Sequence, residues 1–280
     1  MSDFKKIKNK LIDIIPSELF HLNSKLTHSN FQFYDQVIRV QTDPAIKKII
    51  TIAYKKYPCS QKIPLNTNFN SSKKSFDEII QTRHSIRTFD KRPISLDDVS
   101  KLLYYANGVT GKNTDDDNIL HYFRTSPSAG GLHPIEIYLI AINVDGLTPG
   151  IYHYSPMENV LETVSDQNPS EKLNDITFNQ TSNISAVLVL TGIPGKSRFK
   201  YGERGYRFMM LEGGHISQNI LLSANSLDLA SYPIGGFVDD DLDELIGING
   251  VDEVSLYMLM IGTKLKNTQS SKPKVKTSLK

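Results

Sequence analysis

Two arginines and a serine alternate in one short segment of the chain. Arg83, Ser85 and Arg87 are each separated by one residue, so an extended backbone would point all three side chains to the same side. Two guanidinium groups and a hydroxyl on one face can bind a phosphate or another planar anion. A solvated edge strand could carry the same pattern, so a site is predicted only if a second segment completes it.

Two stretches rich in small residues could supply main-chain groups to the same ligand. The first runs from Ser126 to Pro134 and reads SPSAGGLHP, and the second runs from Pro233 to Phe237 and reads PIGGF. Small residues let a ligand approach the backbone and accept hydrogen bonds from its N–H groups. The first stretch also fits a tight loop before a strand. Taken with the arginines, the two stretches predict a flat ligand that has an anionic end.

The spacing of histidine and cysteine does not predict a metal site. The seven histidines and Cys59 form no HxxxH, CxxC or HExxH pattern. One cysteine cannot form an internal disulfide, which suits a reducing compartment. We therefore expect no metal ion and no catalytic thiol.

The composition is typical of a soluble globular protein. The chain has 280 residues, with 32 basic and 30 acidic side chains, so its net charge of +2 gives no reason to expect a nucleic-acid partner. The first residues lack the apolar core of a secretory signal, and no apolar run approaches the roughly 20 residues that span a bilayer. We expect a cytoplasmic protein with no membrane partner.

The elements that must position these segments are predicted from periodicity and capping residues. Helices are expected around Phe4–Ile14, from the N-cap Ser95 to Gly108, and over Glu203–Leu227. Strands are expected at Ile135–Val144, Ile151–Tyr154, Asn159–Val164, Ala186–Ile193 and Val254–Ile261, and Lys112–Asn118 is expected to be a polar loop. Gly213 and Gly214 lie inside the longest helix, which predicts close packing against another backbone. This mixture indicates an α/β or α+β fold with unknown strand order.

The chain divides into three parts by composition. Residues 1–75 form an N-terminal extension with a helix and an irregular docking segment, residues 76–266 form the main domain, and residues 267–280 form a basic flexible tail.

The motifs together resemble one known family. RHSxR at Arg83–Arg87, SPSAGGLHP and PIGG at Pro233–Gly236 occur in the order seen in the FMN-dependent nitroreductase superfamily. SPSAGGLHP together with KYGERGYR at Lys200–Arg207 resembles its SagB-type branch, the azoline dehydrogenases of thiazole- and oxazole-containing peptides. FHLNSK at Phe20–Lys25 is similar to that branch's upstream signature. The resemblance covers roughly Phe76–Lys266, and it implies a homodimeric α+β fold with a central, mostly antiparallel sheet flanked by helices.

The resemblance also implies FMN as cofactor and assigns its contacts. Arg83, Ser85 and Arg87, with His84 alongside, would hold the phosphate, ribityl chain and pyrimidine edge, and Lys264 and Lys266 would give a second phosphate contact. Pro127, Ser128, Ala129, Gly130 and Gly131 would line the isoalloxazine from the other subunit. Pro233, Ile234, Gly235 and Gly236 would complete the site, with the two glycines facing flavin N5. Nitroreductases proper often differ at Gly235 and at Ala129–Gly131, which favours the dehydrogenase branch.

For the reaction, the resemblance implies oxidation of an azoline ring to an azole. Lys200 matches the position of the catalytic base and Tyr201 that of a proton relay or orienting donor. An unperturbed lysine pKa lies near 10, so burial must lower the pKa of Lys200 for it to act near neutral pH. Arg87 would stabilise charge on the reduced flavin, and oxygen would reoxidise it. The implied partners are a peptide or peptide-like substrate and a cyclodehydratase complex.

Three other functions stay open. The first is an NAD(P)H-dependent nitro- or quinone reductase on the same fold. The second is an oxidase of an amino acid or peptide held on a carrier protein. The third is a non-catalytic scaffold of a peptide-modifying complex, with the front helix and Phe31–Tyr57 as its docking surface.

Overall fold

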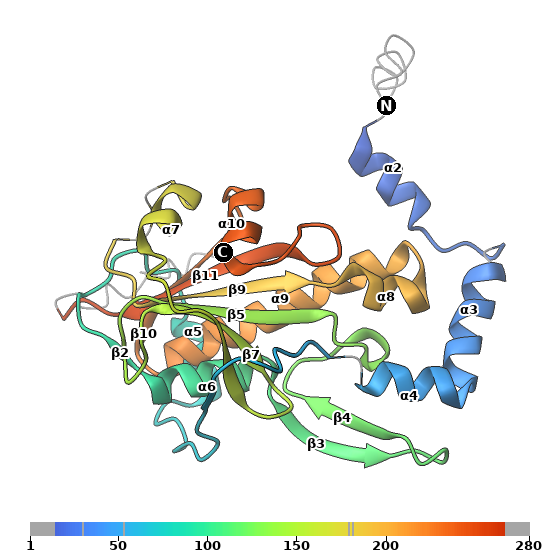
Figure 1. Ribbon diagram of the computed structural model, residues 1–280, viewed down its shortest axis with the longest axis horizontal. Coiled ribbons are helices and arrows are strands. Elements are labelled where there is room, and N and C mark those ends of the chain that lie inside the picture. The colour runs from blue at the N-terminus through green and yellow to red at the C-terminus, as the bar shows by residue number, and fades with distance from the viewer. Residues whose placement is uncertain (1–14, 30, 53, 179, 181, 267–280) are drawn as a thin grey trace, which may run out of the picture.

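A seven-stranded sheet forms the centre of the molecule in the computed structural model, which describes residues 15–29, 31–52, 54–178, 180 and 182–266 (Figure 1). The strand order is β1–β8–β7–β5–β9–β11–β10, and every neighbouring pair is antiparallel. The strands are β1 (Lys62–Pro64), β5 (Ile135–Ala141), β7 (Gly150–Ser155), β8 (Val160–Ser165), β9 (Ala186–Gly192), β10 (Leu229–Ile234) and β11 (Val254–Thr263). The predicted antiparallel α+β fold is confirmed.

Helices cover both faces of this sheet. Because successive side chains of a strand point to opposite faces, Ile137 and Leu139 of β5 pack with α6 (Leu96–Asn107) and α9 (Arg204–Ser226). Tyr138 and Ile140 pack on the other side with α7 (Ser170–Ile176) and α10 (Asp239–Ile246) (Figure 1). The central strands are therefore apolar at nearly every position, which is why the sequence identifies them.

Helix α6 begins and ends where its capping residues predict. The Ser95 hydroxyl accepts a hydrogen bond from Asp98 N at 3.0 Å, and the Asp98 carboxylate accepts one from Ser95 N at 3.2 Å. Gly108 ends the helix, and an added Cβ there would meet Tyr104 O at 2.5 Å. Helix α9 also agrees with its prediction to within one residue at each end.

The predicted polar loop at Lys112–Asn118 is partly wrong. Its first residues belong to β3 (Val109–Thr114), which pairs with β4 (Leu120–Arg124) in a separate hairpin. The strand is polar because Lys112, Asn113 and Thr114 are all exposed, so it lacks the alternation of a half-buried strand. The true turn is shorter, and the Asp115 carboxylate closes it by accepting hydrogen bonds from Asp117 N and Ile119 N.

The front segment is helical where an irregular segment was predicted. It contains α2 (Pro16–Asn23), α3 (Phe31–Thr42) and α4 (Pro44–Ile52). Asp43 caps α4 by accepting hydrogen bonds from Ala45 N at 2.9 Å and Ile46 N at 3.2 Å, a signal that the sequence contained. The helix predicted around Phe4–Ile14 and the tail at 267–280 lie outside the described residues.

The remaining elements are short. They are α5 (Phe76–Thr82), α8 (Pro194–Tyr201), the 3₁₀ turn η1 (Ala129–Gly131), and the paired strands β2 (Ile94–Ser95) and β6 (Val144–Asp145). The close backbone packing predicted for Gly213 and Gly214 is not found among the described residues. An added Cβ on Gly213 would meet only side chains at 3.9 Å, and one on Gly214 would meet nothing within 4 Å.

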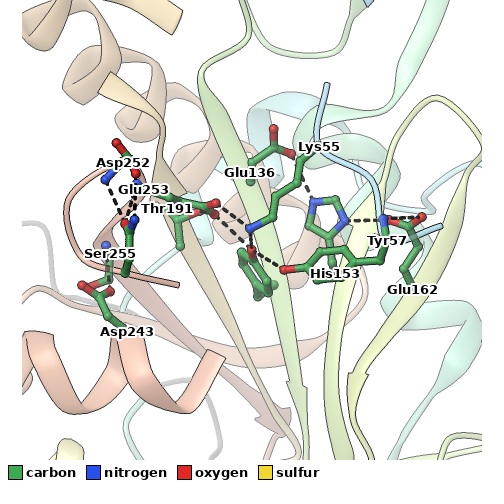
Figure 2. A network of polar contacts seen from close by, with 12 residues as sticks. Lys55, Tyr57, Glu136, His153, Glu162, Thr191, Asp243, Asp252, Glu253 and Ser255 are labelled. Carbon is green, nitrogen blue, oxygen red and sulfur yellow. Dashed lines mark hydrogen bonds and ion pairs between the residues drawn. The ribbon is translucent and has the colours of Figure 1, made fainter. Parts of the chain in front are cut away.

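A polar network fastens the segment after α4 to the sheet (Figure 2). Lys55 Nζ lies 2.6 Å from a carboxylate oxygen of Glu253, whose other oxygen accepts hydrogen bonds from Tyr138 at 3.0 Å and Thr191 at 2.6 Å. The Tyr57 hydroxyl joins this network by its hydrogen bond to Tyr138 at 3.0 Å. The front segment is thus joined to the sheet by charged as well as apolar contacts.

Figure 2 also shows His153 between two carboxylates. Its ring nitrogens lie 2.9 Å from Glu162 and 3.2 Å from Glu136, and all three side chains are buried. Burial opposes protonation of His153, but the hydrogen bonds and charges of the two carboxylates outweigh it and raise the pKa of the histidine. This charged triad ties β5, β7 and β8 together.

Candidate active site

Lys200, Tyr201 and Gly130 meet at one point. An added Cβ on Gly130 would lie 2.9 Å from Lys200 Nζ and would collide with the Tyr201 hydroxyl. Gly130 has a φ of +64°, a conformation that favours glycine. The small-residue loop Pro127–Gly131 and the pair Lys200–Tyr201, far apart in the sequence, therefore come together as one group.

Lys200 is a buried amine without an acidic partner. Its side chain is at the end of α8 and makes no hydrogen bond or ion pair within the described part of the chain. Burial lowers the pKa of Lys200 from 10.5, and burial raises the pKa of Tyr201 from 10.0. Both shifts favour the neutral form, so Lys200 is suited to accept a proton and the Tyr201 hydroxyl to donate a hydrogen bond.

Close helix packing positions this pair. Gly202 ends α8 with a φ of +52°, and an added Cβ on Gly205 would lie 2.6 Å from the carbonyl oxygen of Ser197. Helices α8 and α9 can therefore approach closely only because Gly205 has no side chain. The Tyr201 ring lies 5.0 Å from the ring of Phe208 on α9 and 6.3 Å from the ring of Phe33 on α3.

The segment with the two arginines is extended and lies beside β10. Ile86 N donates a hydrogen bond to Ser231 O at 3.0 Å, and the Arg87 guanidinium lies 5.5 Å from the Tyr232 ring centre. Arg83 and Ser85 are partly buried, whereas His84 and Arg87 are exposed. Neither arginine forms an ion pair with a described residue, so both charges are available to an anion.

The other predicted cofactor contacts lie near this segment. Pro233 and Ile234 end β10, and the two glycines after them, Gly235 and Gly236, are exposed. Lys264 follows β11, which pairs with β10, and its amine lies 3.7 Å from Asp228. Burial lowers the pKa of Lys264. Lys266 is exposed two residues further along.

One chain thus forms two groups of predicted site residues rather than one. Lys200 and Tyr201 precede the first residue of α9, while Asn225, next to its last residue, donates a hydrogen bond to Thr82 at 2.8 Å just before Arg83. A helix of 23 residues is about 34 Å long, so the two groups lie towards opposite ends of α9 (Figure 1). Within one copy of the chain, the two groups are therefore separated by the length of this helix.

Two segments that carried the family resemblance contact each other. Arg207 donates hydrogen bonds to Ser24 Oγ at 2.8 Å and to His21 O at 2.6 Å, and Arg204 donates to Ser24 O at 3.2 Å. Gln36 of α3 adds a hydrogen bond to Phe199 O at 2.5 Å. The front helices therefore hold the helix ends that carry Lys200 and Tyr201.

Sequence analysis missed the buried carboxyl group of Glu212. It is 2% exposed and lies on α9 beneath the Pro127–Gly131 loop, with neither oxygen hydrogen-bonded to a described residue. Burial raises its pKa to about 7. A detectable signal existed, because Glu212 falls between Met209 and Ile216 on the apolar stripe of the helix.

The sequence profile of the nitroreductase family matches residues 80–263, which is more than half of the chain. The chain belongs to the nitroreductase family. Within the described residues, no group of three His, Cys, Asp or Glu side chains could hold a metal ion. No helix in the same residues combines the length and the apolar character needed to cross a bilayer.

Three relatives are similar in sequence at 30% identity each. The protein MJ1384 of Methanocaldococcus jannaschii, provisionally named a nitroreductase, aligns over 68% of this chain and 91% of its own length. The microcin B17-processing protein McbC of Escherichia coli aligns over 54% of this chain and 55% of McbC. The trifolitoxin-processing protein TfxB of Rhizobium leguminosarum bv. trifolii aligns over 49% of this chain and 38% of TfxB. The chain thus spans about half or less of the two peptide-processing relatives, and their similarity supports the predicted SagB-type branch.

Solved structures agree on the fold. A nitroreductase-type structure from Anabaena variabilis has a TM-score of 0.67 at 24% identity and covers 87% of this chain, which spans 45% of that protein. A chain of the E. coli microcin synthetase complex McbBCD, with truncated pro-MccB17 bound, has a TM-score of 0.56 at 22% identity and covers 89% of this chain and 92% of that one. The predicted nitroreductase-like fold is confirmed.

Proposed function

We propose that this chain is an FMN-dependent dehydrogenase that oxidises an azoline ring in a peptide to an azole. The observation that carries the proposal is the contact of the unpaired Lys200 amine with Gly130, in the loop expected to line a flavin. The similarity to two proteins named for microcin and trifolitoxin processing supports a peptide substrate.

The residues present fit a flavin of this kind. Arg83 and Arg87 have no acidic partner among the described residues, which suits a phosphate. Gly236 is exposed with nothing within 4 Å of an added Cβ, so its backbone is open to a planar ring. When bound, FMN would supply the hydride acceptor at N5 and pass the electrons on to oxygen. His84, Ser85, Lys264 and Lys266 complete the proposed phosphate and ribityl contacts.

Lys200 would remove the proton in the reaction. Oxidation of the ring removes a proton from the carbon next to the carbonyl group and a hydride from the neighbouring carbon. Neutral Lys200 would accept that proton, and the protonated Tyr201 hydroxyl would orient the substrate or pass on a proton by a hydrogen bond. Arg87 would place its positive charge at the electron-accepting end of the site.

A homodimer would complete this site. Arg83–Arg87 and Pro233–Gly236 of one copy would face Pro127–Gly131, Lys200 and Tyr201 of the other. Helix α9 presents Met210 and Leu211, which are 54% and 60% exposed, and an unfilled Gly214 on the same helix. These apolar groups support burial of α9 against a second copy. A cyclodehydratase would be the partner that forms the azoline.

The test compares Lys200→Ala with Lys73→Ala, which removes an exposed lysine elsewhere. Purified protein should be yellow with bound FMN and should convert a synthetic thiazoline peptide to a thiazole with the loss of two hydrogens. Lys200→Ala should keep FMN and lose at least about a hundredfold in rate, while Lys73→Ala keeps both. The wild-type rate should rise with pH, with a midpoint below 10.5, as Lys200 loses its proton.

Other results would contradict the proposal. Protein that stays colourless after addition of FMN is not a flavoenzyme. Unchanged turnover in Lys200→Ala would assign the base to another residue. Rapid bleaching by NADPH with no thiazole formed would favour the nitro- or quinone reductase.

A further inference from the structure

Arg124 lies in a cavity that the proposed reaction does not yet use. The cavity has a volume of about 280 Å³ and opens between α4, the β3–β4 hairpin and the loop Gly131–His133. Ile50 and Tyr54 contribute from the front segment, and Arg124 contributes from β4. The front segment therefore forms one wall of the cavity.

Arg124 has no counter-ion among the described residues. Its Nε is buried without a hydrogen-bond partner, and it forms no ion pair within 4.0 Å. Glu136 is already engaged by Lys196 at 2.8 Å and by His153 at 3.2 Å. Glu136 and Glu212 both act on Arg124, but only from beyond ion-pair distance. A partly buried guanidinium without a counter-ion lowers the stability of the folded protein, so a bound anion would raise that stability.

The rest of the cavity wall favours a single negative charge on an apolar group. Tyr54, Tyr122 and Phe123 are aromatic, and Lys196 is neutralised by Glu136. Burial lowers the pKa of His133 to about 3, so its imidazole is neutral. Its Nδ1 has no hydrogen-bond partner among the described residues and lies 4.0 Å from a carboxylate oxygen of Glu212. His133 also has a φ of +45°, a strained conformation for a non-glycine residue. One unpaired cation matches a carboxylate better than a doubly charged phosphate.

The cavity continues towards Lys200. A second cavity of about 140 Å³ shares Ile50, His121 and Gly131 with the first and is also lined by Gly130 and Lys200. A molecule that reacts at Lys200 could therefore place another group beside Arg124, on the far side of the Gly131–His133 loop.

We propose that Arg124 is the centre of a carboxylate-binding site and that this site receives an acidic group of the substrate. The carboxylate would accept hydrogen bonds from the Arg124 guanidinium, and the aromatic side chains would enclose the group that carries it. The link to the substrate rests on the proposed dehydrogenase function, whereas the anion site rests on the cavity and its unpaired arginine.

The test uses benzoate and its neutral analogue benzamide as probes of the whole chain in calorimetric titrations. Benzoate should bind at least about tenfold more tightly than benzamide, and Arg124→Met should remove that preference. Lys112→Met, which removes an exposed charge from the same hairpin, should preserve it. Ile50→Trp should block benzoate by filling the cavity with Arg124 intact, which keeps the test valid if Arg124→Met does not fold.

Three outcomes would overturn the site: equal binding of both probes, benzoate binding that survives Arg124→Met and Ile50→Trp, or inorganic phosphate competing more strongly than acetate. None of these titrations requires flavin or turnover, so their failure leaves the dehydrogenase proposal standing. Conversely, a protein that fails to bind FMN can still show the benzoate preference.

The link to the substrate is tested with two thiazoline peptides that differ only in a Glu or a Gln near the ring. Wild-type protein should have a lower KM for the Glu peptide than for the Gln peptide. Arg124→Met should remove this difference in KM and change kcat little.

Discussion

Burial favours the neutral form of both Lys200 and Tyr201, and these neutral forms would suit the two different roles proposed for them. A neutral amine can accept a proton, and a neutral phenol can donate a hydrogen bond. One environment that excludes water therefore favours both functional forms. The proposed base would therefore need no adjacent carboxylate to lower its pKa. At the residue scale, the proposed site therefore depends on the burial of Lys200 and Tyr201 rather than on an adjacent counter-ion.

Glu212 should make stability fall with rising pH. Its folded-state pKa of about 7 exceeds the ordinary value of 4.5, so the folded state binds the proton more tightly than the unfolded state. The stabilisation is complete below pH 4.5 and is lost as the pH rises through 7. Glu212→Gln should therefore gain stability relative to wild type, by on the order of 3 kcal/mol at pH 8 compared with pH 4.5.

Urea unfolding of both proteins at pH 4.5 and pH 8 measures this difference. Glu244→Gln, a change on an exposed side chain of α10, is the control and should show no such pH-dependent gain. An equal difference between Glu212→Gln and wild type at the two pH values would show that Glu212 titrates normally.

At the scale of elements, the front helices are joined to the domain at both ends. Arg204 and Arg207 hold the region of Ser24, and Lys55 holds the chain after α4 through Glu253 (Figure 2). Between these anchors, α3 contacts α8, and α4 covers the cavities that lead to Lys200 and Arg124. The extension is thus part of the proposed substrate site.

Lys55→Met should destabilise the protein by about 2–3 kcal/mol, because Glu253 would remain buried without its cation. Lys56→Met removes an exposed neighbouring charge and should cost less than about 0.5 kcal/mol. Chemical denaturation of both variants measures the two costs. Adding Glu253→Gln to Lys55→Met should recover part of the loss, and a double variant as unstable as the sum of the single changes would mean that the pair is not coupled.

At the scale of the whole molecule, the proposed FMN site is divided along α9. The cationic segment at Arg83–Arg87 and the pair Lys200–Tyr201 cannot meet within one chain, because α9 separates them. The exposed Met210 and Leu211 offer a surface through which a second copy could bring them together. Assembly and cofactor binding should therefore be coupled.

Leu211→Glu should convert the proposed dimer to a monomer and weaken FMN binding by at least about tenfold, because a charge on the exposed helix face that a second copy would bury opposes association. Light scattering after size-exclusion chromatography and FMN fluorescence titration measure the two effects. Ile38→Glu, on the 56%-exposed Ile38 of α3, is the matched control and should change neither. A monomeric Leu211→Glu that binds FMN normally would place the whole flavin site in one chain.

Local patterns in the amino-acid sequence were enough to predict most elements of the main domain. The β5 and β9 strands are apolar at successive positions because helices cover both faces of the sheet, and α6 follows from its capping box and Gly108. Short-range patterns of this kind depend on neighbouring residues alone. They did not predict β3, whose residues Lys112–Thr114 are polar and exposed. They also did not predict α3 and α4, which pack against α8 and the hairpin, although Asp43 is a local capping signal for α4.

Which of the candidate site residues face each other depends on the packing of distant segments. Motifs predicted that Gly130 and Lys200 belong to one site, but their contact depends on the packing of α8 against α9 at Gly205. The buried Glu212 and the unpaired Arg124 acquire their properties from residues distant in sequence, because solvent exclusion and charge proximity are set by the folded arrangement. The amino-acid sequence tells which residues carry ionisable groups, and the fold sets the burial and the neighbouring charges that shift their pKa values.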